Sequence, residues 1–272
     1  MVCGMKLITS GDNQVYRAAI QLKQKKYRDV QKRYLIEGPN LIREALGNGE
    51  KIDMIIHSED LTAESFRNED LDLTQTDAPV AVMSSGLFRR LSDTESPQGI
   101  MAVVKKRIYS EEEFFAAKPG ANVIVLDRLQ DPGNVGTILR TADAAGYMGA
   151  ILLKGTADVY APKIVRAAAG SLFRLPVLMA DTPGHVVRLL KEHGKTILCA
   201  TLNGSRSYYD ADLKENAAVI IGNEGNGVCE EFLDRSDVLI RIPMEGPVES
   251  LNAAVSAGIL MYESVRQRHR QR

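Results

Sequence analysis

The sequence of 272 residues contains few cysteines, no long apolar run and almost no net charge. Cys3, Cys199 and Cys229 are far apart and odd in number, which excludes a disulfide framework and a zinc site, so we interpret them as reduced residues without a chemical role. No segment is apolar over the length that a bilayer crossing needs. Because the N-terminus also lacks a secretory signal, we expect a cytoplasmic protein with no membrane and no metal among its partners.

Two nucleotide-binding motifs are absent as well. A phosphate-binding loop of the form G-x-x-x-x-G-K-[ST] does not occur, which argues against ATP binding. The dinucleotide fingerprint G-x-G-x-x-G does not follow a first strand either. A nucleotide-dependent oxidoreductase is therefore disfavoured.

Net positive charge is concentrated near the two ends of the chain. Overall 34 basic residues balance 35 acidic ones, but residues 1–34 carry eight basic and two acidic side chains, and the last seven residues add four arginines. The scarcity of turn formers predicts one helix over residues 12–33 with an inner stripe that includes Val15, Ala19 and Leu22. Its basic residues are candidates for contacts with phosphates, the alternative being a solvated helix face.

Alternating strand and helix patterns predict an α/β protein with two domains. The first covers residues 1–106, with strands near 34–36, 54–56, 80–83 and 99–104 and a helix that begins at Pro39. Residues 107–120 are interpreted as a linker with one helical turn. The second domain, residues 121–272, is expected to be a parallel sheet covered by helices on both faces, with a last helix over about 250–266. Its strands are predicted at 123–126, 150–153, 175–179, 196–202, 217–221 and 238–242.

Three predicted strands of this second domain end in polar, glycine-rich turns. Ligands bind at the carboxyl ends of the strands in parallel α/β sheets. The first of these turns spans residues 127–140, in which Asp131-Pro132-Gly133 is an expected turn and Asn134 an expected helix cap. Arg140 follows six residues later, a rise of about 9 Å, and its side chain can lean back toward the strand end. The alternative is a capped helix with a solvated arginine.

The other two turns lie late in the chain. Residues 221–227 hold three glycines that let the backbone approach a ligand, with Glu224 either exposed or directed into the cleft. In residues 242–255, Ser250 is the expected cap of the last helix and Asn252 is expected in its first turn. Free amides at such a helix start favour a carboxylate or a phosphate. Each turn alone is also compatible with a purely structural role.

Together, the three turns resemble the motifs of the SpoU (TrmH-type) RNA 2′-O-ribose methyltransferases in order and spacing. The matching patterns are Asn134-x-Gly136-x-x-x-Arg140, Gly222-x-Glu224-x-x-Gly227, and Ile242-Pro243-Met244 followed by Ser250-Leu251-Asn252. The resemblance covers residues 123–266 and implies a deep trefoil knot, S-adenosylmethionine as the cofactor and a homodimer. Residues 34–38 and 92–99 also resemble the small RNA-recruiting domain that many members carry.

The resemblance assigns roles to individual residues. Its active-site positions correspond to Asn134, Arg140, Glu224, Ser250 and Asn252. The positions around the methyl donor correspond to Leu202, Gly204, Gly222, Ile242, Met244 and Leu251, where glycine permits close approach and Ile242 and Leu251 offer apolar walls to a purine. The candidate RNA-binding residues are Lys23, Lys25, Lys26, Arg28, Lys32 and Arg33.

The expected reaction explains these residue types. A ribose 2′-hydroxyl loses its proton as it attacks the donor methyl group, and the developing alkoxide needs positive charge nearby. Because guanidinium scarcely deprotonates, we expect Arg140 to hold the target phosphate and stabilise the alkoxide rather than to act as the base. The other polar residues would orient Arg140 and the ribose.

We therefore expect S-adenosylmethionine-dependent 2′-O-methylation of a ribose in structured RNA, and the recruiting-domain resemblance favours 23S ribosomal RNA. One alternative is a tRNA ribose 2′-O-methyltransferase. Another is a non-catalytic RNA-binding or assembly factor of the same fold, against which the intact Arg140 and Asn252 count.

Overall fold

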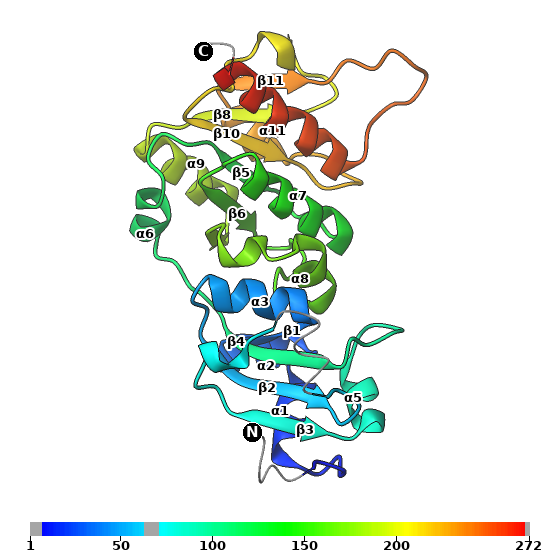
Figure 1. Cartoon of the computed structure of the whole chain (residues 1–272). Coiled ribbons are helices and arrows are strands. Elements are labelled where there is room, and N and C mark those ends of the chain that lie inside the picture. The colour runs from blue at the N-terminus through cyan, green and yellow to red at the C-terminus, as the bar shows by residue number, and fades with distance from the viewer. Residues whose placement is uncertain (1–6, 63–70, 270–272) are drawn as a thin grey trace. The chain divides into compact units, whose positions relative to one another are not determined.

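The computed structural model describes residues 7–62 and 71–269, and the chain divides into two compact units (Figure 1). Unit 1 comprises Met1–Arg107 and Asp158–Phe173, and unit 2 comprises Ile108–Ala157 and Arg174–Arg272. Cys3, Lys6, Arg270 and Arg272 lie outside the described residues.

Unit 1 is built on a mixed four-stranded sheet with the order β1-β4-β2-β3. β4 pairs antiparallel with both β1 and β2, and β2 pairs parallel with β3. The strands are β1 (Arg33–Glu37), β2 (Ile52–Ser58), β3 (Val80–Met83) and β4 (Ile100–Lys105). The helices are α1 (Gln14–Gln21), α2 (Lys25–Gln31), α3 (Pro39–Gly47), α5 (Ser85–Leu91) and α8 (Pro162–Ala168), with 3₁₀ turns η1 (Leu73–Gln75) and η2 (Ser171–Phe173).

Strand alternation gives the unit 1 sheet two apolar faces. On β1, Tyr34 and Ile36 pack into one core with α3, Val165 of α8 and Phe173. Leu35, between them, packs on the other face with residues of α1 and α5. Successive strand residues point to opposite faces, so both sides of this small sheet are buried. This is why the segment Asp158–Phe173, which lies inside the range expected for the second domain, groups with unit 1.

The predicted single helix over residues 12–33 is wrong, because the chain forms two short helices there. Asn13 caps α1 through a hydrogen bond from the N–H of Val15, and Gln24, before α2, is extended. The guanidinium of Arg28 donates to the carbonyls of Leu22 and Lys23, at 2.7 Å each. A buried side chain thus takes the carbonyls that a continuous helix would have used.

Unit 2 is built on a seven-stranded parallel sheet with the order β7-β6-β5-β10-β8-β11-β9. The strands are β5 (Val123–Leu126), β6 (Gly149–Leu153), β7 (Val177–Ala180), β8 (Thr196–Ala200), β9 (Arg206–Ser207), β10 (Ala217–Ile221) and β11 (Val238–Arg241). The helices are α6 (Glu111–Ala116), α7 (Pro132–Ala144), α9 (Pro183–Glu192), α10 (Glu230–Arg235) and α11 (Ala253–His269), with the 3₁₀ turn η3 (Tyr208–Asp210).

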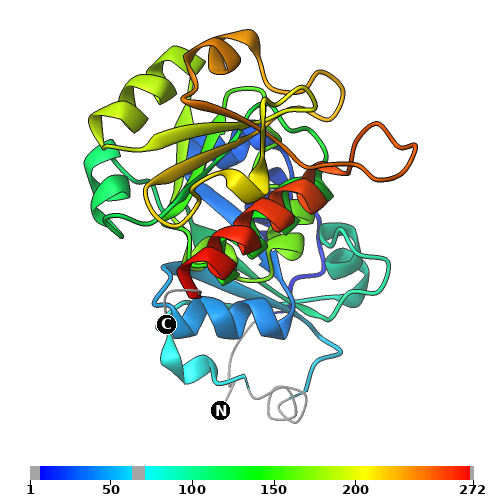
Figure 2. The same cartoon turned by 90° about the horizontal axis from the view of Figure 1, so that it is seen from above.

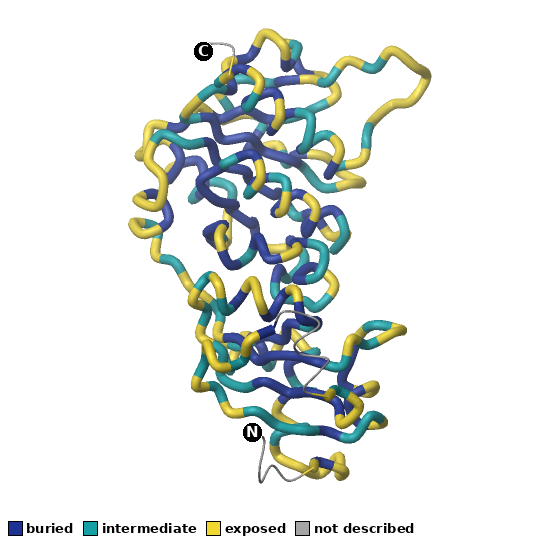
Figure 3. The backbone as a smooth tube through the Cα atoms, in the orientation of Figure 1, coloured by how far each residue is buried: buried dark blue, intermediate teal, exposed yellow. Residues whose placement is uncertain are grey.

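Helices cover both faces of this sheet, as expected. One face packs on Phe114 of α6, on α9 and on Phe232 of α10. On the other side, α7 and α11 pack against each other, and the views from the side and from above agree that α11 runs across the sheet (Figures 1 and 2). The central strands β5 and β10 are buried along their whole length (Figure 3). The expected α/β fold with a parallel sheet and a separate N-terminal domain is confirmed.

Some local elements differ from expectation. The expected linker contains α6, whose start is a capping box in which Ser110 and Glu113 bond each other's backbone. The two-residue strand β9 was not predicted, because a pairing this short leaves no periodic pattern. Among the described helices, none is long and apolar enough to span a membrane.

Candidate active site at the carboxyl ends of the parallel strands

The sheet order places the predicted site segments next to one another. β5, β10, β8 and β11 are consecutive neighbours in the sheet and run parallel, so their carboxyl ends lie along one edge. Asp127 follows β5, Gly222 follows β10, and Ile242 follows β11. Leu202 comes two residues after β8 ends. Segments that are more than 100 residues apart in sequence thus share one edge of unit 2.

Glu224 joins the loop after β10 to the loop after β5. Its carboxylate accepts hydrogen bonds from the backbone N–H groups of Gln130 and Asp131, at 3.2 and 3.1 Å, and from Nδ2 of Asn134 at 3.1 Å. Burial raises the pKa of Glu224, but these hydrogen bonds to the charged form outweigh it, and the pKa lies below its ordinary value of 4.5. Glu224 is therefore an ionised anchor that fixes one loop against the other.

Asn134 extends this connection to the last helix. Nδ2 of Asn252 donates to Oδ1 of Asn134 at 2.9 Å, while Oδ1 of Asn252 accepts from the N–H groups of Ala254 and Val255. Glu224, Asn134 and Asn252 thus form one hydrogen-bonded chain, which we call the strand-end network. One residue from each of the three sequence motifs takes part in it.

Two expected helix caps are corrected by these contacts. Asp131, not Asn134, caps α7, because its carboxylate accepts from the N–H of Asn134 at 2.8 Å and Pro132 is already helical. Asn252, not Ser250, caps α11, since Asn252 accepts the first free amides. Asn134 lies inside α7 and Asn252 immediately precedes α11, and their side-chain amides bond each other.

Asp127 is a structural partner of the site that sequence reasoning left without a role. It is fully buried, accepts from the N–H of Cys229 at 2.7 Å, and pairs with the guanidinium of Arg128. Arg128 adopts a left-handed conformation with φ 59°, and its carbonyl accepts from Nδ2 of Asn223 at 2.8 Å. A polar residue directly after a buried strand is the sequence signal that could have identified Asp127.

The two predicted cofactor glycines, Gly204 and Gly222, are also needed for the folding of their own loops. A Cβ on Gly222 would lie 2.2 Å from the carbonyl carbon of Gly227, where the loop closes on itself through the pair Asn223 and Gly227. A Cβ on Gly204 would lie 2.5 Å from the backbone of Ile240. In both cases the close approach is to the chain's own backbone, so each glycine shapes its loop.

The side chains at these strand ends fit an adenosyl group in their chemistry. Leu202 is 59% exposed, and Ile242, Met244 and Leu251 are half-buried. Apolar side chains that remain accessible at neighbouring strand ends suit a purine ring, which gains free energy from leaving water.

The structure does not place every predicted catalytic residue in the strand-end network. Arg140 and Ser250 are exposed, and among the described residues neither side chain has a hydrogen-bond or ion-pair partner. Arg140 lies on α7, the helix that also carries Asn134. Its guanidinium is therefore available for an anionic ligand, whereas Asn134, Glu224 and Asn252 are engaged with one another.

The candidate RNA-binding residues of unit 1 fall into two groups. Arg28 is 3% exposed and bound to the carboxylate of Asp158 at 2.7 and 2.9 Å, so its assignment as a phosphate contact is wrong. Lys23 is paired with Asp93 at 2.7 Å, and Arg33 is paired with Asp53. The exposed side chains are Lys25, Lys26 and Lys32.

Cysteine and metal chemistry contribute nothing visible to this site. Burial raises the pKa of Cys199 to about 12 and also raises the pKa of Cys229, so neither described thiol is readily ionised. Within residues 7–62 and 71–269, no group of three or more His, Cys, Asp or Glu side chains could hold a metal ion.

Comparisons with known proteins agree with the geometry. The model of the SpoU rRNA Methylase family matches residues 121–262, and that of the MRM3-like substrate binding domain matches residues 13–102. The chain belongs to the SpoU rRNA methylase family. The resemblance drawn from the three turns is thereby confirmed, and with it the expectation of an RNA 2′-O-methyltransferase that uses S-adenosylmethionine.

Individual relatives cover nearly the whole chain. The 23S rRNA (guanosine(2553)-2′-O)-methyltransferase RlmP of Bacillus subtilis (strain 168) is 37% identical over 95% of this chain and 98% of its own. The AdoMet-bound rRNA methyltransferase from Sinorhizobium meliloti is 30% identical, with a TM-score of 0.86 over 97% of this chain and 98% of that one. The SpoU methyltransferase AviRb from Streptomyces viridochromogenes, in complex with AdoMet, is 29% identical, with a TM-score of 0.85 over 94% and 98%.

Proposed function

We propose that the chain transfers the methyl group of S-adenosylmethionine to the 2′-oxygen of a ribose in 23S ribosomal RNA. The strand-end network carries this proposal, because Glu224, Asn134 and Asn252 bring one residue of each motif into contact. The choice of RNA is supported by the Bacillus subtilis relative, whose name gives a guanosine of 23S rRNA as its target.

The network is proposed to hold the reacting groups rather than to exchange protons. Glu224 stays ionised and binds the loop after β5, and Asn134 and Asn252 fix the starts of α7 and α11. Arg140, free on the same helix as Asn134, binds the phosphate of the target nucleotide and stabilises the developing alkoxide. Ser250 lies in the exposed loop before α11, where its hydroxyl orients the ribose.

The adenosyl group is proposed to bind at the ends of β8, β10 and β11. The residues that would hold it are Leu202, Gly204, Gly222, Ile242, Met244 and Leu251. When bound, the donor supplies an electrophilic methyl group on a sulfonium. The protein's contribution is alignment, which accounts for about 7 to 11 kcal/mol of barrier lowering in well-oriented reactions.

The remaining domain roles are part of the same proposal. Residues 1–106 recruit the RNA, with Lys25, Lys26 and Lys32 as phosphate contacts. Residues 121–272 catalyse methyl transfer, and residues 107–120 join the two.

We further propose a trefoil knot, a homodimer and a cytoplasmic location. The insertion of β10 between β5 and β8, and the packing of α11 on α7, support a C-terminal segment that passes through a loop of the chain. Val255 and Tyr262 leave 51% and 53% of their surface exposed on α11, which a second subunit would cover. Light scattering of the purified chain measures the subunit number, and an experimental chain trace tests the knot.

The function is tested by methyl transfer to defined RNAs. Purified chain is incubated with radiolabelled S-adenosylmethionine and with unmodified 23S rRNA, 16S rRNA or bulk tRNA, and ribose methylation is then mapped on the RNA. We expect incorporation into one nucleotide of 23S rRNA. Incorporation into tRNA alone would mean that the substrate is tRNA and not 23S rRNA. If the chain binds the methyl donor but none of the three RNAs is methylated, the non-catalytic alternative is favoured.

A further inference from the structure

A cavity of about 490 Å³ lies in unit 1, whereas the strand-end network belongs to unit 2. It opens between the end of β2, the helix α5 and the loop that precedes β4. A volume of this size falls in the range of small-ligand sites. We call it the unit 1 pocket, and it is lined by Ser58, Asp60, Leu61, Ser85, Phe88, Arg89 and residues 95–99.

The walls of the unit 1 pocket are fixed by hydrogen bonds. Glu59 accepts from the N–H and the hydroxyl of Ser85, which ties the end of β2 to the start of α5. Glu37 accepts from the hydroxyls of Ser92 and Thr94, at 2.6 and 3.0 Å, and so anchors the loop before β4. The pocket is therefore built before any ligand binds.

Two glycines complete this construction. Gly38 has φ 101°, and a Cβ there would lie 2.2 Å from Oε1 of Gln98. Gly99 has φ 78°, and a Cβ there would contact Leu61 at 3.0 Å. The approach of Gly38 to Gln98 lies between the sequence segments 34–38 and 92–99, which the hydrogen bonds from Ser92 and Thr94 to Glu37 also join.

The lining of the unit 1 pocket includes three exposed polar side chains. Arg89, Glu95 and Gln98 are exposed, and among the described residues none of them has a hydrogen-bond or ion-pair partner. Arg89 is followed by a second exposed arginine, Arg90. The pocket thus combines a free cation, a free carboxylate and a free amide around one hollow.

This set of groups selects a class of ligand. A guanidinium at the rim matches a phosphate, and a carboxylate matches a pair of neighbouring N–H donors. Among the four RNA bases, guanine alone presents two adjacent N–H donors on its Watson–Crick edge. Such an edge is accessible only in an unpaired nucleotide.

We propose that the unit 1 pocket binds one unpaired guanine nucleotide of the RNA substrate, with Glu95 on the base and Arg89 on the adjacent phosphate. The inference rests on the proposed function, because it takes the ligand to be part of the RNA that is methylated. It gives unit 1 a base-specific contact in addition to the phosphate contacts proposed for Lys25, Lys26 and Lys32.

Short RNAs test the pocket independently of catalysis. Binding of the full chain to fluorescein-labelled UUGUU and UUUUU is measured by fluorescence anisotropy at two salt concentrations. We expect tighter binding of UUGUU by about fivefold or more, the size of one bidentate base contact. Equal binding of the two RNAs by the unchanged chain would overturn the proposal.

Two variants separate the base contact from the phosphate contact. Glu95→Gln should abolish the preference for UUGUU over UUUUU, measured as the ratio of the two affinities. Arg89→Gln should weaken both RNAs equally, with the slope of log affinity against log salt reduced by about 0.7 and the guanine preference retained. A preference that survives Glu95→Gln, or an Arg89→Gln variant that binds like the unchanged chain, would contradict the assignment.

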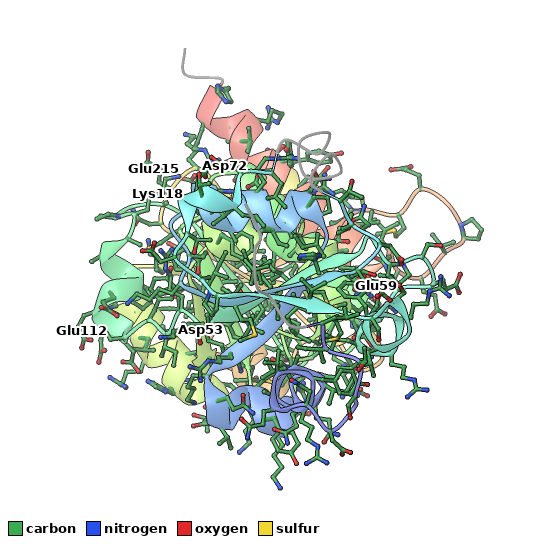
Figure 4. The ribbon with its side chains drawn as sticks, turned by 60° about the horizontal axis from the view of Figure 1, so that its bottom comes forward. Asp53, Glu59, Asp72, Glu112, Lys118 and Glu215 are labelled. Carbon is green, nitrogen blue, oxygen red and sulfur yellow. The ribbon has the colours of Figure 1, made fainter. Side chains whose placement is uncertain are left out.

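Lys51→Gln is the matched control for charge. Lys51 is exposed and precedes β2, at the opposite end of that strand from Ser58, which is roughly 23 Å for seven residues. Figure 4 labels Asp53 and Glu59, which mark these two ends of β2. Lys51→Gln should bind both RNAs as the unchanged chain does. If it weakens binding as much as Arg89→Gln, the effect of Arg89→Gln comes from net charge and not from a contact in the pocket.

The outcome is distinguishable from that for the proposed function. If the two pocket variants change RNA binding as expected but the unchanged chain methylates no RNA, the pocket proposal is supported and the catalytic proposal fails. If methyl transfer occurs and the short RNAs are not discriminated, the catalytic proposal stands and the pocket inference fails.

Discussion

The strand-end network of unit 2 and the basic segment of unit 1, residues 23–33, use polar residues in opposite ways. In unit 2, Asn134, Glu224 and Asn252 come from distant segments and bond directly to one another. In unit 1, neighbouring basic residues differ in exposure: Arg28 is buried in an ion pair, whereas Lys25 is exposed. The spaced sequence motifs predicted residues that contact one another in the structure, namely Asn134, Glu224 and Asn252. The run of basic residues, in contrast, did not show which side chains are buried in ion pairs and which are exposed.

The largest effect is expected at Arg140, the cationic motif residue that lies outside the strand-end network. Arg140→Ala should lower kcat for RNA methylation by about 10²- to 10³-fold, because it removes the charge proposed to stabilise the alkoxide. Binding of S-adenosylmethionine, measured by calorimetry, should not change. Arg188→Ala, at an exposed arginine of α9, is the control and should keep full activity. Normal turnover by Arg140→Ala would show that the active site is misplaced.

Arg28, the buried residue of the basic segment, is expected to contribute to stability, whereas its exposed neighbour Lys25 is not. Arg28→Ala leaves Asp158 without its partner and frees the carbonyls of Leu22 and Lys23, so the free energy of unfolding should fall by about 3 kcal/mol. Lys25→Ala should change it by less than about 0.5 kcal/mol. Urea denaturation measures both variants, and equal stabilities would mean that the Arg28 ion pair contributes nothing.

These contrasts define what the sequence could predict. The alternating patterns located the central strands, because β5 and β10 are buried throughout and read as apolar runs. Spacing also identified the members of the network. It did not give the hydrogen-bond partners, so Asn134 and Ser250 were expected as caps where Asp131 and Asn252 serve. The burial of Arg28 depends on Asp158, 130 residues away, and no local pattern contains that information.

A close backbone contact in the loop after β10 provides a test of the unit 2 geometry. Gly222→Ala places a methyl group 2.2 Å from the backbone of Gly227, so the loop that carries Glu224 must move. We expect kcat/KM for RNA methylation to fall by about tenfold. Gly225→Ala, whose Cβ would meet its nearest neighbour at an ordinary 3.6 Å, is the matched control. Similar activities for the two variants would contradict a rigid Glu224 loop.

The exposed lysines of unit 1 should affect RNA binding without affecting the fold. Replacing Lys25, Lys26 and Lys32 together by glutamine should weaken RNA binding about fivefold and reduce the salt slope by about 2, since each neutralised contact with single-stranded RNA contributes about 0.7. Filter binding at several salt concentrations measures both quantities. Unchanged affinity would return these lysines to an ordinary solvated surface, with S-adenosylmethionine binding as the check on folding.

The smallest expected effect is the pH dependence that Glu224 gives to the network. Its pKa in the folded chain lies below the ordinary 4.5, so its contribution to stability is fully present above that value and is lost as the pH falls through the folded pKa. Glu224→Gln cannot titrate, and the difference in unfolding free energy between the unchanged chain and this variant should therefore shrink as acid is added from pH 6 toward pH 3.

An exposed carboxylate supplies the matched control. Glu249 lies in the loop before α11, and among the described residues its side chain has no hydrogen-bond or ion-pair partner, so Glu249→Gln replaces a carboxylate without removing such a bond. Urea denaturation at several pH values measures all three proteins. If the difference between the unchanged chain and Glu224→Gln stays constant from pH 6 to pH 3, the hydrogen bonds from Gln130, Asp131 and Asn134 do not favour the ionised carboxylate.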